Sequence, residues 1–302
     1  MKKFKNGRTG VFPLWLVLLA ISIISVPAEG QLITDSILVE GHYRSFHFNK
    51  PSAAVRDATL FFILHGSGGH GKQMIEGASR LEGIAAAENL VIVYPDGYKN
   101  YWNECRKLAT SAANRENINE AAFFEGMIKY FADNYKINRE HVVAAGLSGG
   151  GHMAYKMAFT MPGKIAAITA FVASLPDTTN MDCIPLRVPV PVMIINGTAD
   201  PVNPYNGGEI KTTGAYLGTV RSTEATFKYW ANLAGFTGTP TRTNLPDLDS
   251  TDGKTIVRYS YRKKGKPSVV LLEVKNGKHD YPNDIDVYLE AWKFFKEELK
   301  IN

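Results

Sequence analysis

Apolar and polar residues follow two different patterns along this 302-residue chain. Short continuous apolar runs, bounded by Gly, Pro or polar residues, indicate strands that are covered on both faces. Six such runs occur, at 58–66, 89–97, 141–149, 166–174, 190–200 and 268–274. Longer stretches with helical spacing of their apolar residues lie between them, at 118–135, 150–161, 222–235 and 284–300.

The ends of these expected helices carry capping signals. Asn117 or Asn119 can cap the first helix, Ser222 begins the third with a capping box, and Pro162-Gly163 ends the second. Strand followed by helix, repeated along the chain, predicts an α/β fold with a mostly parallel central sheet flanked by helices. Because ligands of such sheets bind beyond the carboxyl ends of the strands, functional side chains are expected in the loops there.

The first 30 residues differ from the rest of the chain. Four basic residues precede the apolar run 11–26, and small residues at 28 and 30 follow it. This pattern is typical of a secretory signal peptide at 1–30. A membrane anchor is the alternative, but the run is short against the ~20 apolar residues of a spanning helix. We therefore expect one secreted domain at 31–302, extracellular or periplasmic, without stable membrane insertion.

Charge and cysteine content narrow the class of protein. Loss of 1–30 would remove four basic residues and one acid, so the formal charge of +5 would fall to +2. A nearly neutral protein has little electrostatic attraction for nucleic acid, and the basic cluster 262–266 is interpreted as a solvated hairpin tip. The two cysteines favour one disulfide over two buried free thiols in an oxidising compartment, and they form no zinc site.

A lone serine stands where an apolar run changes to a helical pattern. Residues 146–150, Gly-Leu-Ser-Gly-Gly, fit G-x-S-x-G between a strand and a helix, the arrangement called a nucleophile elbow. The turn is so sharp that the neighbours of the serine must be small, and it leaves the hydroxyl standing clear of the sheet. Ser148 is therefore the expected nucleophile.

A serine hydroxyl needs a histidine as base and an acid behind it. In this type of fold the three follow the chain order Ser, then Asp or Glu, then His. Only His279 follows Ser148 outside the helix that the serine begins, and it lies in a loop after the run 268–274. The other histidines are His42, His47, His65, His70, His141 and His152.

The expected acid is Asp200, which ends the run 190–200 just before Pro201. Other carboxylates lie between the serine and the histidine, in a polar stretch interpreted as an ordinary solvated loop: Asp247, Asp249 and Asp252. Asp280 is adjacent to His279, and neighbouring side chains seldom face one another. Position at a strand end therefore favours Asp200.

Two backbone amides are expected to bind the oxyanion that forms on the substrate. One is the amide of Gly149, at the start of the helix after the serine. The second should come from the glycine-rich loop 64–69, where Ser67 is favoured and Gly66 is the alternative. His65 is expected to brace this loop by hydrogen bonds rather than to act as a base.

Several separate motifs carry a family resemblance. In chain order they are LHGSGG (64–69), VYPDGYKNYWNEC (93–105), the stretch 118–158 around Ser148, CIPLRVPVPVMIINGTADPVNPYNGG (183–208), LPDLDSTDGKTIV (245–257) and NGKHDYP (276–282). Together they resemble the secreted esterases grouped as polyhydroxybutyrate depolymerases, which overlap with feruloyl esterases of carbohydrate esterase family 1. The resemblance runs from about residue 40 to 290.

This resemblance implies an α/β-hydrolase fold and a serine esterase that forms an acyl-enzyme. It carries the catalytic triad onto Ser148, Asp200 and His279. It also implies that Cys105 pairs with Cys183.

The same resemblance places three further residues near the substrate: Trp102, Asn103 and Tyr281. Tyr281 follows Asp280 where the family usually has Thr and Trp, which changes what lines the pocket. For Trp102 and Tyr281, substrate binding and core packing both remain open, since aromatic residues do both.

The expected function is hydrolysis of a carboxylic ester, with no metal or organic cofactor. The ester would be a feruloyl or acetyl group on a plant polysaccharide, or a polyester. A serine peptidase of the same fold is one alternative, disfavoured because no gating domain is recognisable. A non-catalytic binding protein is the other, disfavoured because a binder does not need all three triad residues. The sequence indicates neither the natural ester nor the oligomeric state.

Overall fold

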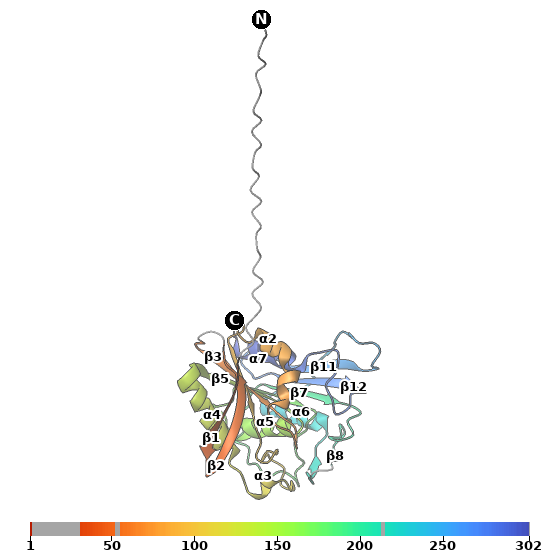
Figure 1. The fold of residues 1–302 in the computed structure, drawn as a ribbon. Coiled ribbons are helices and arrows are strands. Elements are labelled where there is room, and N and C mark those ends of the chain that lie inside the picture. The colour runs from red at the N-terminus through yellow and green to blue at the C-terminus, as the bar shows by residue number, and fades with distance from the viewer. Residues whose placement is uncertain (2–30, 52–54, 213–214, 302) are drawn as a thin grey trace.

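The computed structural model describes residues 1, 31–51, 55–212 and 215–301. The expected signal peptide lies, apart from Met1, outside the described residues and stays a prediction. Within the described ranges, one ten-stranded sheet runs through the molecule with helices on both faces (Figure 1). In this part of the chain, every helix is too short or too polar to cross a lipid bilayer.

Six parallel strands form the centre of the sheet. In spatial order they are β4 (Leu90–Pro95), β3 (Ala58–Leu64), β5 (Ile137–Leu147), β6 (Ala167–Phe171), β7 (Val192–Gly197) and β12 (Val269–Lys275). Each of them overlaps one of the six apolar runs, although β5 begins four residues before its run, and the predicted mostly parallel sheet is confirmed. Nearly all of their residues are buried, as expected for strands covered on both faces.

Antiparallel strands extend the sheet at both edges, and the apolar pattern did not predict them. They are β1 (Leu32–Val39) and β2 (His42–Asn49) at one edge, and β11 (Thr255–Tyr261) and β10 (Thr241–Asn244) at the other. Every residue of β10 is exposed, and β1 alternates between exposed and half-buried positions. Edge strands with an open face lack a continuous apolar run. A separate small pair joins β8 (Gly208–Glu209) to β9 (Thr219–Val220).

Four long helices occupy the predicted stretches: α4 (Glu120–Tyr135), α5 (Gly149–Thr160), α6 (Thr223–Leu233) and α7 (Val287–Leu299). The chain also forms three short helices that were not predicted: α1 (Gln73–Gly77), α2 (Ser79–Ile84) and α3 (Ala112–Arg115). Asn119 caps α4 by accepting from the amide of Ala122. Ser222 caps α6 in the same way through Ala225. The predicted capping box is wrong, because Ala225 stands where the reciprocal Glu or Gln would be.

The hydrophobic core has two layers, one on each face of the sheet. Neighbouring strand residues point to opposite faces, so Phe62 packs on Phe124 of α4, with ring centroids 5.2 Å apart. Phe61 packs on Phe295 of α7 at 5.3 Å. Helices cover both faces, and this leaves the loops at the carboxyl edge of the parallel strands as the place for a site.

Candidate active site

Ser148 occupies the sharp turn between β5 and α5. Its backbone has φ 52° and ψ −113°, a conformation that side-chain-bearing residues rarely adopt. The amide of Ser148 donates to the carbonyl of Phe171 at 2.8 Å, which ties the turn to the end of β6. A Cβ on Gly146 would collide with the backbone of Gly150. The glycines around the serine are therefore required by the turn itself.

His279 lies between Ser148 and Asp200. Its Nε2 is 2.9 Å from Ser148 Oγ, and its Nδ1 is 2.7 Å from Asp200 Oδ2. The second carboxylate oxygen, Oδ1, accepts from the amides of Val202 (2.8 Å) and Asn203 (2.9 Å). These amides orient the carboxylate so that Oδ2 faces the imidazole. The side chain of Asp200 is 2% exposed and that of His279 is 21% exposed, so water reaches the histidine but hardly the acid.

Ser67 and Gly149, which carry the two expected oxyanion donors, lie against each other next to Ser148 in the chain turn. A Cβ added to Gly149 would lie 2.8 Å from the Ser67 amide nitrogen and 2.5 Å from its Oγ. Neither amide donates a hydrogen bond to an acceptor in the described ranges of the chain. Two neighbouring backbone N–H groups without an acceptor among the described residues are suited to binding an oxyanion. A Cβ added to Gly66, the alternative donor, would lie 3.5 Å from the Leu147 carbonyl oxygen and 3.5 Å from Ser148 Cβ.

His65 braces the loop that carries Ser67. Its Nε2 accepts from the amide of Gly97 at 2.8 Å, so Nδ1 carries the proton and donates to the carbonyl of Gly66 at 2.7 Å. Burial lowers the pKa of His65, which keeps the ring neutral. Both ring nitrogens are occupied, so His65 holds the loop and has no free nitrogen to act as a base.

Trp102 and Asn103 lie under this loop and are almost fully buried. The Trp102 indole donates to the carbonyl of His65 at 2.9 Å and stacks against Phe124. Asn103 Nδ2 donates to the carbonyl of Ile118 at 2.9 Å. The Trp102 side chain thus supports the loop that carries Ser67, whereas the Asn103 side chain binds the segment before α4. This placement favours packing over direct contact with substrate.

Tyr281 lies two residues beyond His279 and is half-buried. Its hydroxyl is 2.7 Å from that of Tyr288, and its ring packs edge-on against Phe171 at the end of β6. Burial raises the pKa of Tyr281 to about 12, so the phenol stays protonated. The Tyr281 side chain packs the segment after His279 onto α7. The exposed part of this side chain is available to a substrate.

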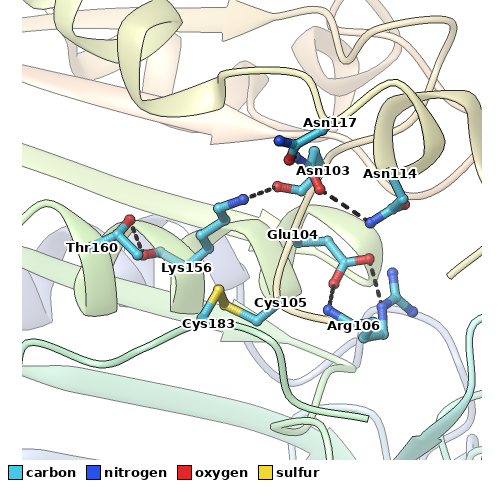
Figure 2. Close-up of a disulfide and its surroundings, with 9 residues drawn as sticks. All are labelled: Asn103, Glu104, Cys105, Arg106, Asn114, Asn117, Lys156, Thr160 and Cys183. Atoms are coloured by element: carbon cyan, nitrogen blue, oxygen red, sulfur yellow. Dashed lines mark hydrogen bonds and ion pairs between the residues drawn. A yellow bond between two sulfur atoms is a disulfide. The ribbon is translucent and has the colours of Figure 1, made fainter. Parts of the chain in front are cut away.

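Charged side chains lie around the disulfide (Figure 2). Glu104 accepts from the backbone amide and from Nε of Arg106, and burial raises the pKa of Glu104 although Arg106 opposes this. Lys156 reaches from α5 to donate to the Asn103 carbonyl at 2.6 Å. Between them, Cys105 is joined to Cys183 in a disulfide, the pairing implied by the family resemblance.

The remaining histidine of α5, His152, is buried one turn after Ser148. Its amide donates to the carbonyl of Ser148, and its ring makes no contact with the serine hydroxyl that would let it serve as base. Burial holds the pKa of His152 well below its usual value, with smaller contributions from Arg106 and His279. Within the described residues, no group of His, Cys, Asp or Glu side chains has the geometry of a metal site.

One residue that supports the site was not predicted. Asn196 is a polar residue in the apolar strand β7, and its amide clamps residue 173 beside the serine turn. Its Oδ1 accepts from the Ala173 amide at 3.0 Å, and its Nδ2 donates to Thr223 Oγ1 at 2.8 Å. A lone asparagine in an otherwise apolar strand was the signal that could have found it, because a buried amide requires partners.

The sheet order, the layers and the serine turn together define an α/β hydrolase. The family model described as phospholipase/carboxylesterase matches residues 50–232, which is more than half of the chain. The protein belongs to this family. The matched range includes Ser148 and Asp200 and ends before His279.

Known proteins with similar sequences include esterases. The NocK protein of Nocardia uniformis subsp. tsuyamanensis, named as an esterase, is 26% identical over 194 residues, 60% of this chain and 54% of NocK. Feruloyl esterase B of Piromyces equi is 25% identical over 206 residues, 68% of this chain and 36% of that protein. The chain thus spans about half or less of the length of these curated relatives.

Solved structures share the fold at low sequence identity. An acetyl xylan esterase from Aspergillus awamori superposes with a TM-score of 0.56 at 15% identity, over 88% of this chain and 100% of its own. The S-formylglutathione hydrolase of Staphylococcus aureus gives a TM-score of 0.52 at 12% identity, over 90% and 99%. These likenesses confirm the predicted α/β-hydrolase fold.

Proposed function

We propose that the protein hydrolyses carboxylic esters with Ser148 as nucleophile, His279 as general base and Asp200 as the acid that orients it. One observation carries the proposal: an unbroken hydrogen-bond chain runs from the carboxylate through the imidazole to the hydroxyl, at 2.7 and 2.9 Å. Membership of the phospholipase/carboxylesterase family supports it.

In the first half of the reaction, Ser148 Oγ attacks the ester carbonyl while His279 Nε2 takes its proton. Asp200 accepts a hydrogen bond from Nδ1–H of the imidazole and stabilises the imidazolium that forms. The carbonyl oxygen becomes an oxyanion, which the amides of Ser67 and Gly149 bind. His279 then gives its proton to the departing alcohol, and the acyl group remains on Ser148.

In the second half, water replaces the alcohol. His279 takes a proton from the water, which attacks the acyl-enzyme through the same oxyanion site, and the carboxylic acid leaves as Ser148 recovers its proton. These protein groups complete both half-reactions without a metal or organic cofactor.

We propose an acyl ester of plant polysaccharide, feruloyl or acetyl, as the substrate class. The support is the similarity to proteins named feruloyl esterase and acetyl xylan esterase. The resemblance of the sequence motifs to polyhydroxybutyrate depolymerases makes a polyester the second candidate. Initial rates on methyl ferulate, acetylated xylan and hydroxybutyrate oligomers distinguish the three, and the highest kcat/KM identifies the class.

We also propose that the protein is secreted. The basic and apolar pattern of residues 1–30 supports this, and so does the disulfide, which persists in oxidising compartments. Detection of the protein in culture medium or periplasm, with its N-terminus near residue 31, is the expected result.

The catalytic assignment is tested with Ser148→Ala. The variant should lose hydrolysis of p-nitrophenyl acetate while keeping its far-UV circular dichroism, because the fold does not depend on the hydroxyl. Ser36→Ala, on the edge strand β1, is the matched control and should retain full activity. Undiminished turnover by Ser148→Ala would reject the mechanism.

A further inference from the structure

A loop that the sequence pattern assigned to solvent lies beside the histidine. Strand β11 runs antiparallel to β12, and Thr255 at its start pairs with Lys275 at the end of β12 (Figure 1). Residues 245–254, which enter β11, therefore lie at the same edge of the sheet as residues 276–286, which follow β12. We call residues 245–254 the strap and residues 276–286 the histidine loop.

The largest contact between strap and histidine loop is made by Asp284. Its Oδ1 accepts from the amide of Leu248 at 2.7 Å and from the amide of Asp249 at 3.1 Å. Asp284 is 4% exposed, and its other oxygen, Oδ2, is buried without a hydrogen-bond partner among the described residues. The Asp284 carboxylate thus binds two amides of the strap through a single oxygen.

Further bonds join the two segments on both sides of His279. Before it, Asn276 Nδ2 donates to the carbonyl of Gly253 at 2.9 Å. After it, Lys254 Nζ lies 3.3 and 3.4 Å from the two carboxylate oxygens of Asp280. Asn283 Nδ2 adds a bond of 2.8 Å to Asp249 Oδ2. The strap therefore contacts the histidine loop on both sides of His279, at residues 276, 280, 283 and 284.

Apart from the strap, the histidine loop is supported near its start and through Tyr281, whose hydroxyl is 2.7 Å from that of Tyr288. The amide of Asn276 donates to Thr198 Oγ1, and the carbonyl of Gly277 accepts from the amide of Ala199. Between His279 and the start of α7, the strap makes the hydrogen bonds to the side chains of Asp280, Asn283 and Asp284. A general base on a loop needs such support, because a displacement of about 1 Å can cost a reaction about a hundredfold.

We propose that the strap, docked through Asp284 and Lys254, is a positioning element that holds His279 between Asp200 and Ser148. Neither docking residue touches the reacting atoms. Asp284 acts through the backbone of the strap, and Lys254 acts through the carboxylate next to the histidine. This inference rests on the proposed ester hydrolysis and adds positioning residues to it.

The test compares Asp284→Ala with Asp284→Asn. Loss of the acceptor in the alanine variant should release the strap and lower kcat about tenfold, with KM within twofold of wild type, because the base is misplaced and the binding surface is kept. The asparagine variant keeps the oxygen that both amides use, and its NH2 replaces an oxygen without a partner. It should therefore retain kcat within about twofold.

A second variant tests the proposal independently, in case Asp284→Ala does not fold. Lys254 is 15% exposed at its side chain and contributes to no core, so Lys254→Met should fold normally and lower kcat about threefold, consistent with a single partly exposed ion pair. Asp35→Ala is the control. Asp35 also joins two elements, β1 to α4 through Tyr130, but at the opposite edge of the sheet, and kcat should not change.

The readouts are kcat and KM on p-nitrophenyl acetate and hydrogen exchange of residues 276–286. Faster exchange with lower kcat in Asp284→Ala, and rescue of both by asparagine, support the proposal. Unchanged kcat in Asp284→Ala and Lys254→Met, or an equal loss in Asp284→Asn, overturns it. Wild type and Ser148→Ala are measured first: if wild-type turnover depends on Ser148, a negative result bears on the strap alone.

Discussion

Replacement of Asp200 by Asn tests the hydrogen-bond chain at its least exposed member. The two amides of Val202 and Asn203 point at Oδ1, so in the variant they select the orientation in which the amide oxygen occupies that position. The amide NH2 then replaces Oδ2 and donates toward His279 Nδ1. The reverse orientation would set the NH2 against two N–H donors, and it is disfavoured for that reason.

The consequence is a change of tautomer at His279. Once Nδ1 accepts a hydrogen bond from the amide, the ring proton moves to Nε2, which then points at Ser148 Oγ as a donor. An imidazole in this form cannot take the serine proton. A loss of about 10⁴-fold in kcat is expected, as for serine-protease acids, and equals about 5.4 kcal/mol in activation free energy.

The assay is steady-state hydrolysis of p-nitrophenyl acetate at pH 7.5, with thermal unfolding as a check of the fold. Glu224→Gln is the matched control, since Glu224 also stands between Ser148 and His279 in the chain, is exposed on α6 and makes no contact with His279. A rate for Asp200→Asn within tenfold of wild type would refute the argument, and a severe loss in the control would move the role to the other carboxylate.

Three further predictions concern the oxyanion site, pH and the disulfide. Gly149→Ala should lower kcat by about 10²-fold or more and also lower Tm, because the new Cβ would lie 2.8 Å from the Ser67 amide nitrogen and displace it. Burial lowers the pKa of His152 in the folded state, so the free energy of unfolding should fall as pH drops below about 6.5, the unfolded value, and His152→Gln should make this fall shallower in denaturant titrations. Reduction of the disulfide, whose cysteines are 78 residues apart, should lower the free energy of unfolding by up to about 4.5 kcal/mol. Reductant should therefore lower the Tm of the wild type, and it should not lower the Tm of Cys183→Ser any further.

The sequence predicted those parts of the fold that have a local signature. Each central strand is buried on both faces, so its run is continuously apolar, and each long helix shows its spacing and a cap such as Asn119. The edge strands were not predicted because one of their faces is open to water. The short helices α1 and α2 were not predicted because five or six residues are too few to show a helical periodicity.

The order of residues along the chain also limited the choice of residues for the candidate triad. Ser148 between glycines, one histidine in the required order and one acid at a strand end were enough to select three residues. The sequence could not assign the polar stretch 245–254, which looks solvated when each residue is judged alone. Its role depends on Asp284, more than thirty residues away, and no local pattern encodes that partner.

The sequence by itself thus determined the layers of the fold, the serine turn and the identity of the candidate triad, because burial and chain order leave marks on neighbouring residues. Only the tertiary structure decided which side chains support the site. Trp102 lies under the oxyanion loop, both nitrogens of His65 are occupied, and the strap crosses the histidine loop. These contacts join residues far apart in the chain, and their geometry exists only once the sheet has assembled.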